Sequence, residues 1–218
     1  MIQNSKVSVI MSAFNTDFKL IKRAIDSVLN QTYENFELIV IDDGSTNDVD
    51  NKLLKYVIKH DEKVTYLRHK NCSQSLSINK GIKLCEGTFI TIIDADDEYK
   101  PNHLQECMEH MPFYDLIAST TETIVDEKSN YFVPNRFDVT QNIHVDECIL
   151  FATLFGKKEV FESFDFLDMY AADADFFEKA SEKFRVNKVD LRTYIYYRNI
   201  PNSISAIVKN DNLIFNLQ

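Results

Sequence analysis

The sequence predicts an α/β protein whose mostly parallel sheet is flanked by helices. Four apolar, β-branched runs recur in the first half, and each is followed by a segment with helical periodicity. The runs are apolar throughout rather than alternating, which is typical of parallel strands covered on both faces. Polar clusters follow these runs, at the edge where open α/β sheets bind ligands. The four runs are residues 6–11, 36–41, 63–68 and 88–93.

The helices expected between these strands have recognisable starts and apolar faces. We expect them at 17–30, at 48–59, at 74–85 and from Pro101 onward. Asp48 would be an N-terminal acid of the second helix, and Pro101 would occupy the first turn of the fourth. Apolar residues at i, i+3, i+4 spacing define the faces of the first and fourth helices, namely Phe18, Ile21, Ala24, Ile25, Val28 and Leu29, and then Leu104, Cys107, Met108 and Met111.

The pattern of predicted strands and helices changes after about residue 112. Residues 113–120 and 130–134 have strand character and could be antiparallel, 144–164 mixes helix and turn, and 193–199 predicts a late strand. A helix is expected at 173–184, with Phe176, Phe177, Ala180 and Phe184 on its apolar side. No Gly/Ser-rich linker separates the segments before and after residue 112. We therefore predict one domain, 1–218, made of halves 1–111 and 112–218.

Composition excludes several classes of function. The chain has 24 Lys and Arg against 34 Asp and Glu and no basic block, which argues against nucleic acid bound through its phosphates. The apolar stretch "CILFATLFG" at 148–156 is too short to span a bilayer, and the N-terminal run is too short for a signal peptide. The four cysteines show no C-x-x-C spacing and are expected as reduced thiols, without a His at ligand spacing.

The segment "DADDE" places four carboxylates directly after the fourth strand: Asp94, Asp96, Asp97 and Glu98. One interpretation is that Asp97 or Glu98 faces the dipole of the following helix. The other is a metal site, because carboxylates at the end of a rigid strand suit Mg²⁺ or Mn²⁺, and the metal would offset their mutual repulsion. An EF-hand loop is excluded, because its sixth and twelfth positions would be Tyr99 and Gln105.

Three segments carry a family resemblance. "VSVIMSAFN", "AIDSVLNQTYENFELIVIDDGSTND" and "EGTFITIIDADDEYKP" resemble, in order and spacing, the family 2 glycosyltransferases, which have the Rossmann-like GT-A fold. The resemblance is strongest over 7–101 and resumes at "LFGKKEVFE" and from "AADADFF" through "YIYYRN". It implies that 1–111 is a nucleotide-binding half and that 112–218 is a smaller, partly antiparallel, acceptor-side half.

The resemblance implies roles for individual residues. Phe14 would stack on the base of the donor, and Asp43 would accept a hydrogen bond from the base N3–H; opening the turn before Gly44 is the alternative for both Asp42 and Asp43. Asp97 would be the principal ligand of Mn²⁺ or Mg²⁺, shared with Asp96. The implied nucleotide-binding set is Ser12, Ala13, Phe14, Asp43, Ser73, Asp94 and Asp96, the last two on the ribose side.

The resemblance places the catalytic base in the second half. Asp173 would deprotonate the acceptor hydroxyl, and Asp175 is the second candidate or an acceptor-binding residue. An N-cap or first-turn acid is the alternative for Asp173. The chain departs from the family at four positions, where Gly, Arg, Glu and His are usual, and Lys70, Lys80 or Arg68 could replace the lost Arg; the four residues are Ser73, Ile78, Ala172 and Ile200.

The expected function is a metal-dependent, inverting transfer of a sugar from a nucleotide-diphosphate sugar, most simply a UDP-sugar. The acceptor would be a saccharide or a lipid-linked glycan in cell-surface polysaccharide synthesis. We expect a cytoplasmic protein, free or peripheral at the inner face of the membrane, as a monomer or as a homo- or hetero-oligomer. The alternative is a catalytically weak, nucleotide-sugar-binding partner subunit, which the four departures motivate.

Overall fold

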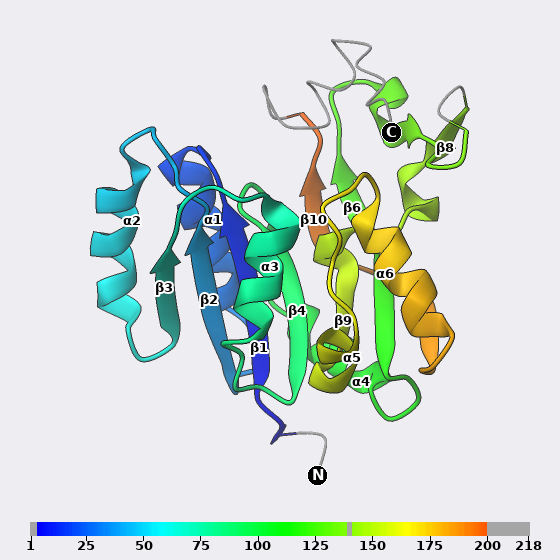
Figure 1. Cartoon of the computed structure of the whole chain (residues 1–218), viewed down its shortest axis with the longest axis horizontal. Helices are drawn as coiled ribbons and strands as arrows, with labels where there is room; N and C mark the ends of the chain where they lie inside the picture. The colour runs from blue at the N-terminus through cyan, green and yellow to red at the C-terminus, as the bar shows by residue number, and fades with distance from the viewer. Residues whose placement is uncertain (1–3, 139–140, 200–218) are drawn as a thin grey trace.

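The computed structural model describes residues 4–138 and 141–199 and has one eight-stranded sheet at its centre (Figure 1). The strands follow the order β3-β2-β1-β4-β9-β6-β10-β5. The first four positions are the expected parallel half, in which β1 pairs with β2 and β4, and β2 pairs with β3. Their bounds are β1 Val7–Ala13, β2 Phe36–Asp42, β3 Val64–Arg68 and β4 Phe89–Asp94.

The other half of the sheet is mixed. Strand β9 lies between β4 and β6 and is antiparallel to both, whereas β10 is parallel to β6. The short β5 closes this side by antiparallel pairing with β10. A separate antiparallel pair is formed by β7 and β8. The bounds are β5 Glu98–Tyr99, β6 Leu116–Ile124, β7 Phe132–Pro134, β8 Asn142–His144, β9 Leu154–Lys157 and β10 Val186–Tyr197.

Helices cover both faces of the sheet, as the apolar strands require. Figure 1 shows α3, α5 and α6 in front of the sheet and α1 and α4 behind it. Successive residues of β1 point to opposite faces: Val9 and Met11 belong to the apolar cluster with α1, α2 and α4, and Ile10 to the cluster with α3, α5 and α6. The helix bounds are α1 Phe18–Leu29, α2 Val49–Val57, α3 Gln74–Ile82, α4 His103–His110, α5 Lys158–Ser163 and α6 Ala172–Ser181.

The register of the parallel strands aligns their carboxyl ends. Ala13 is the pairing partner of Asp42, and Ser12 is the partner of Asp94. The last residues of β2, β1 and β4 therefore lie in neighbouring rows at one edge of the sheet. This confirms that the polar segments after the first, second and fourth strands meet at a common edge.

The strands of the second half differ from the predictions. Strand β6 begins at Leu116 instead of 113, and β10 begins at Val186 instead of 193. Residues 128–131 form a 3₁₀ helix, so only the end of the expected strand at 130–134 is extended. The stretch 144–164, which was expected to mix helix and turn, also contributes the central strand β9. The antiparallel character is thus confined to β9, β5 and the small β7–β8 pair.

Two helix starts also differ. Pro101 precedes α4, whose N-cap is Asn102, so it does not occupy the first turn. Asp48 is the N-cap of α2, as its position suggested, but its φ is 55° and its side chain makes no capping hydrogen bond. The helix expected at 173–184 ends at Ser181. Phe184 lies beyond the helix and packs against the apolar cluster with α3, α5 and α6.

Asp115 anchors the start of β6 to its two neighbouring strands. Its carboxylate accepts hydrogen bonds from Lys157 Nζ at 2.6 Å and from Arg185 Nη2 at 3.0 Å. Hydrogen bonds from Arg185 and then from Lys157 hold the pKa of Asp115 well below its usual value, against the opposing effect of partial burial. Asp115 is therefore ionised in the folded protein at neutral pH, and its charge stabilises the fold.

Replacing Asp115 with Asn should destabilise the protein in a pH-dependent way. Because the folded-state pKa is depressed, its stabilising contribution is complete above the unfolded pKa of about 4 and is lost as the pH falls below it. We expect the free energy of unfolding, measured with urea, to fall by about 1–2 kcal/mol at pH 7 and by less at pH 3. The value at pH 7 is modest because Arg185 is exposed to solvent, which weakens its ion pair with Asp115. The exposed Asp61, changed to Asn, is the control and should alter stability by less than about 0.5 kcal/mol. Equal losses for Asp115→Asn at both pH values would contradict this account.

Candidate functional site

The loop after β1 forms one wall of the candidate site. Ala13 O accepts a hydrogen bond from Asp43 N at 2.9 Å, which joins this loop to the end of β2. Phe14 is 49% exposed, so its ring is available for a stacking contact. Asn15 N donates to Ser45 Oγ at 3.0 Å and holds the two loops together. The structure thus leaves Ser12, Ala13 and Phe14 at the sheet edge where the resemblance implied nucleotide binding.

Asp42 has a structural role. Its side chain is fully buried, and its Oδ1 accepts a hydrogen bond from Ser45 N at 2.8 Å. Its Oδ2 accepts from Tyr66 Oη at 3.1 Å, and Arg68 Nε lies 3.5 Å away. These contacts show Asp42 opening the turn before Gly44, one of the two interpretations that the sequence allowed.

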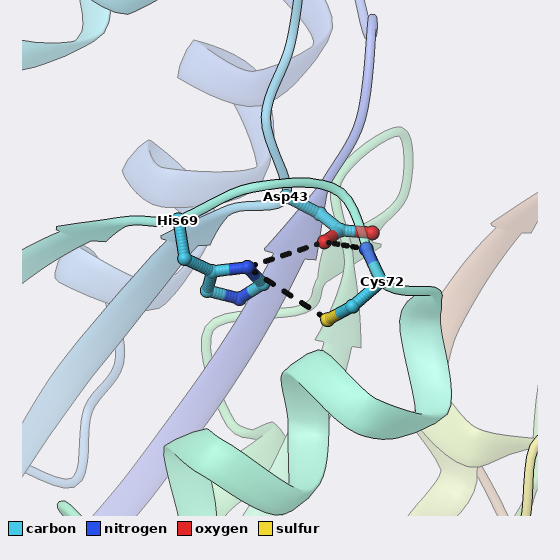
Figure 2. A group of neighbouring side chains, drawn as sticks. All are labelled: Asp43, His69 and Cys72. Carbon is cyan, nitrogen blue, oxygen red and sulfur yellow. Dashed lines mark hydrogen bonds and ion pairs between the residues drawn. The ribbon is translucent and has the colours of Figure 1, made fainter.

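Asp43 organises the loop that joins β3 to α3. Its Oδ1 accepts a hydrogen bond from Cys72 N at 2.8 Å, and its Oδ2 accepts from Asn71 Nδ2 at 3.0 Å and Ser73 N at 3.1 Å. His69 Nδ1 lies 3.4 Å from Oδ1 (Figure 2). Since Asp43 is only 2% exposed, its first effect is to fix the 69–73 loop against the end of β2.

Gly44 lets this loop approach closely. Its φ of +77° favours glycine, and a Cβ built there would lie 2.6 Å from Asn71 N. Ser73, where the family usually has Gly, also has a positive φ of 100°, so a side chain is held in a strained backbone conformation. Its Oγ is buried without a hydrogen-bond partner among the described residues. The loop is therefore tightly placed and carries an unsatisfied hydroxyl.

Two of the other departures from the family are buried apolar residues. Ile78 is fully buried in the apolar cluster with α3, α5 and α6, and Ala172 is 1% exposed. Arg68 is held by Asp50 and by Ser45 O at 2.8 Å, and Lys80 Nζ lies 3.3 Å from Cys72 Sγ. The fourth departure, Ile200, lies outside the described residues.

Asp94 and Asp96 are the half-buried carboxylates after β4. Gln74 Nε2 donates to Asp94 Oδ1 at 2.8 Å, which ties the start of α3 to the end of β4. Burial first, and then the carboxylates of Asp96 and Asp173, raise the pKa of Asp94 to about 7, against the opposing effect of the hydrogen bond from Gln74. Burial also raises the pKa of Asp96, opposed by its own N–H and by Arg23. The two carboxylates therefore lie in a site short of positive charge.

Asp97 differs from its neighbours. It is fully buried, and its Oδ2 accepts a hydrogen bond from Tyr194 Oη at 2.5 Å, while Oδ1 accepts from Tyr197 N at 2.7 Å. Burial raises its pKa well above the usual value, and Asp94 and Asp96 add to the effect. With both oxygens engaged by β10, Asp97 links β4 to β10.

Asp173 lies in the first turn of α6. Its effect on the pKa of Asp94 shows that the two carboxylates are electrostatic neighbours. Asp173 Oδ1 accepts from Ala174 N at 2.8 Å, and Oδ2 accepts from Phe151 N at 3.1 Å. The first-turn interpretation is thus met, and the same carboxylate is near enough to Asp94 to raise its pKa. Burial raises its pKa to about 6, opposed by hydrogen bonds from the backbone N–H groups of Ala174, Phe151 and Asp173 itself.

Asp175 is not part of this group of carboxylates. Its Oδ2 accepts a hydrogen bond from Lys179 Nζ at 2.7 Å, an i,i+4 ion pair along α6. Sequence reasoning missed two residues near the site. Gln74 contacts Asp94, and Arg136 lowers the pKa of Asp173. Neither belongs to a recognisable motif, and the position of Gln74 at the start of a helix facing β4 is the only signal that the sequence offered.

The residues at the end of β4 fit a hard divalent cation. Asp94 and Asp96 supply the carboxylate oxygens that Mn²⁺ and Mg²⁺ prefer, and Mg²⁺ commonly binds with one or two carboxylates plus phosphate oxygens and water. The raised pKa of Asp94, caused by burial and by two neighbouring carboxylates, shows that positive charge is lacking there. The donor set and its uncompensated charge therefore suit such a metal.

A mixed sheet with carboxylates at the ends of β2 and β4 and a third carboxylate on a facing helix is the architecture of the GT-A glycosyltransferases. The chain belongs to glycosyl transferase family 2, because residues 8–169 match that family. An uncharacterized glycosyltransferase from Rickettsia bellii is 39% identical over 131 residues, covering 60% of this chain and 19% of the relative. The glycosyltransferase GlyA from Streptococcus pneumoniae is 23% identical, covering 75% of this chain and 22% of the relative. The chain therefore spans about a fifth of the length of these two curated relatives.

Solved structures share the fold. The mannosyltransferase PcManGT from Pyrobaculum calidifontis, in complex with GDP-Man and Mn²⁺, superposes with a TM-score of 0.71 at 17% identity, over 93% of this chain and 59% of that chain. TarS 1-349 from S. aureus, in complex with UDP-GlcNAc, gives a TM-score of 0.68 at 20% identity, over 88% of this chain and 58% of that chain. At these identities the likeness establishes the GT-A fold.

The different contacts of Asp96 and Asp97 predict different effects of truncation. Asp97→Ala removes the acceptor of two hydrogen bonds, one of them from the fully buried Tyr194. It should lower the free energy of unfolding, measured with urea, by about 1–3 kcal/mol. Asp96→Ala removes a carboxylate whose ionised form is disfavoured by burial, so stability should stay within about 0.5 kcal/mol of the wild type or rise. A larger loss for Asp96→Ala than for Asp97→Ala would contradict the assignment of Asp97 as the structural member.

Proposed function

We propose that this domain transfers a sugar from a nucleotide-diphosphate sugar, most simply a UDP-sugar, to a hydroxyl acceptor with inversion at the anomeric carbon. The observation that carries the proposal is that Asp173, at the start of α6, lies near enough to Asp94, at the end of β4, for its carboxylate to raise the pKa of Asp94. A donor bound along the strand ends would present its anomeric carbon between these two groups. Membership of family 2 supports the reaction class.

The nucleotide would lie along the ends of β1, β2 and β4. The half-exposed ring of Phe14 offers a stacking face for the base, and the 69–73 loop, held by Asp43, offers the opposite edge. The unpartnered Ser73 Oγ is an available hydrogen-bonding group in that loop. The base N3–H would approach Asp43, where a uracil can compete with the loop donors for the carboxylate. Asp94 would accept hydrogen bonds from the ribose.

The diphosphate would lie next to Asp96, with Mn²⁺ or Mg²⁺ held by Asp96 and by the phosphates. When bound, this metal supplies positive charge to the departing diphosphate. We assign Asp97 to support: it holds the end of β4 against β10 through Tyr194 and Tyr197, which keeps Asp96 in place. This assignment moves the principal metal ligand from Asp97 to Asp96.

Asp173 would act as the general base. Its two backbone hydrogen bonds, from Ala174 and Phe151, fix its orientation, and a pKa of about 6 leaves it mostly ionised at pH 7 and above. It can therefore accept the proton of the acceptor hydroxyl as the oxygen attacks the anomeric carbon. Asp175 is paired with Lys179, which argues for a role on the helix surface or toward the acceptor.

The acceptor would be a saccharide or a lipid-linked glycan, as in the synthesis of cell-surface polysaccharides. Exposed apolar side chains on the α6 side of the sheet, Leu167 at 43%, Met169 at 46% and Tyr170 at 40%, offer it an apolar surface. In the part of the chain that the structure describes, no helix has the length and apolarity needed to cross a bilayer. We propose action in the cytoplasm, free or at the inner face of the membrane.

The test is nucleoside diphosphate release from a panel of UDP- and GDP-sugars with mixed saccharide acceptors and Mn²⁺. Asp173→Asn keeps an acceptor oxygen for Phe151 N but removes the base, so we expect transfer to fall by about 10²–10⁴-fold. UDP affinity should change less than about twofold, because Asp173 lies on the acceptor side. Asp175→Asn, on the same helix, is the matched control and should retain activity within a few-fold.

Full activity in Asp173→Asn would refute the base assignment. UDP binding by the wild-type protein without turnover on any donor would instead support the alternative of a weak, nucleotide-sugar-binding partner subunit. The buried Ala172, which leaves Asp173 without an adjacent carboxylate, is the observation that favours this second candidate.

A further inference from the structure

A second group of metal-ligating side chains lies at the ends of β2 and β3. Asp43 comes from the end of β2, and His69 and Cys72 come from the loop before α3 (Figure 2). Among the described residues these three are the only group of three or more His, Cys, Asp and Glu donors whose ligand atoms all lie within 4.8 Å of one another. Sequence reasoning placed no His at ligand spacing from a Cys, which is wrong, because His69 precedes Cys72 by three residues.

The distances match a tetrahedral zinc site. Typical Zn–N, Zn–O and Zn–S bonds of about 2.0–2.3 Å place the nitrogen about 3.4 Å from the oxygen and about 3.6 Å from the sulfur. In this structure His69 Nδ1 lies 3.4 Å from Asp43 Oδ1 and 3.7 Å from Cys72 Sγ. Both separations that involve His69 Nδ1 therefore match a shared zinc ion, and the Asp43 oxygen and Cys72 Sγ lie within 4.8 Å of each other.

Both Cys72 and His69 have polar neighbours outside the proposed ligand set. Lys80 Nζ lies 3.3 Å from Cys72 Sγ. His69 Nδ1 lies 2.8 Å from Lys70 O, and Nε2 lies 3.3 Å from Ser77 Oγ. The contact with Lys70 O uses an Nδ1–H, because a carbonyl oxygen only accepts. Zinc on Nδ1 would replace this hydrogen bond, the ring proton would move to Nε2 and donate to Ser77 Oγ, and the thiol proton would be released to solvent. Ser77 thereby becomes the outer partner that metal-bound histidines usually have.

The donor set distinguishes this group from the carboxylates after β4. One sulfur, one nitrogen and one oxygen select zinc-like ions, whereas Asp94 and Asp96 offer oxygen alone. Three protein ligands leave a fourth position open, and both His69 and Cys72 are partly exposed, which gives an ion a path of entry. Cys72 is a free thiol.

We propose that Asp43, His69 and Cys72 form a Zn²⁺ site, and that its occupancy antagonises nucleotide binding. The ion would take the Asp43 oxygen and pin the 69–73 loop to the end of β2. The antagonism rests on the proposed function, because it requires the nucleotide base to use the same loop. The metal site itself does not depend on that function.

Cobalt is the spectroscopic probe for the site. The full chain with reduced thiols, titrated with Co²⁺ alone, should bind one ion per chain with a near-ultraviolet thiolate-to-cobalt band and visible tetrahedral bands, all abolished by Zn²⁺. Cys72→Ser should lose the near-ultraviolet band, and His69→Gln should weaken binding at least about 100-fold, since even outer-partner losses cost about 10–100-fold. Cys148→Ser, at another partly exposed thiol, is the matched control and should keep the spectrum. Circular dichroism confirms that each variant is folded.

The absence of a thiolate band in the wild type, or its retention in Cys72→Ser, would overturn the site. A second titration measures UDP affinity with and without saturating Zn²⁺. We expect at least about a tenfold loss in the wild type and no such loss in Cys72→Ser, which also separates this site from zinc bound at Asp96. An equal loss in both proteins would overturn the antagonism. If UDP fails to bind the zinc-free protein, the proposed function fails, while the cobalt spectrum still decides the metal site.

Discussion

The parallel pairing of β1 with β2 and β4 is the constraint on which the candidate site depends. Because these strands share one direction and one register, Ala13 pairs with Asp42 and Ser12 pairs with Asp94 at a common edge. Both faces of the sheet are covered by apolar helices, so polar side chains can gather only where the strands end. A shift of register would separate the loop of Phe14 from the carboxylates after β4.

The carboxylates at this edge divide into two with both oxygens occupied by protein donors and two that are half-buried with raised pKa values. Asp42 and Asp97 are both fully buried, and each has both oxygens occupied by protein donors. Their hydrogen bonds hold the ends of β2 and β4 in place. Asp94 and Asp96 remain half-buried beside Asp97, with raised pKa values that reflect missing positive charge. A stable support and an uncompensated pair at adjacent positions are what a site for a cation and a diphosphate requires.

The first half of the fold could be predicted because its signals are local. Apolar runs and helical periodicity identify β1 to β4 and their helices to within a few residues. The second half depends on contacts between distant segments. The four residues of β9 become a central strand only because β4 and β6 lie on either side of them. Strand β10 begins in the polar stretch from Val186 and contains an irregularity between Val189 and Tyr194, which hides it from pattern reasoning.

The same distinction holds for the site. The positions of Ser12, Phe14 and Asp94 at strand ends followed from sequence order alone, and the structure places them there. The role of Asp97 could not follow, because Tyr194 and Tyr197, which occupy its oxygens, come about a hundred residues later. The grouping of Asp43 with His69 and Cys72 likewise needed the loop after β3 to fold back on the end of β2.

We propose that the ends of β1, β2 and β4 bind a nucleoside diphosphate together with a divalent cation. Calorimetric titration of the protein with UDP, in the presence and absence of Mn²⁺, tests this proposal. We expect Mn²⁺ to raise the affinity for UDP at least about tenfold, equivalent to about 1.4 kcal/mol. An affinity that is the same with and without metal, or no binding of UDP under either condition, would contradict it.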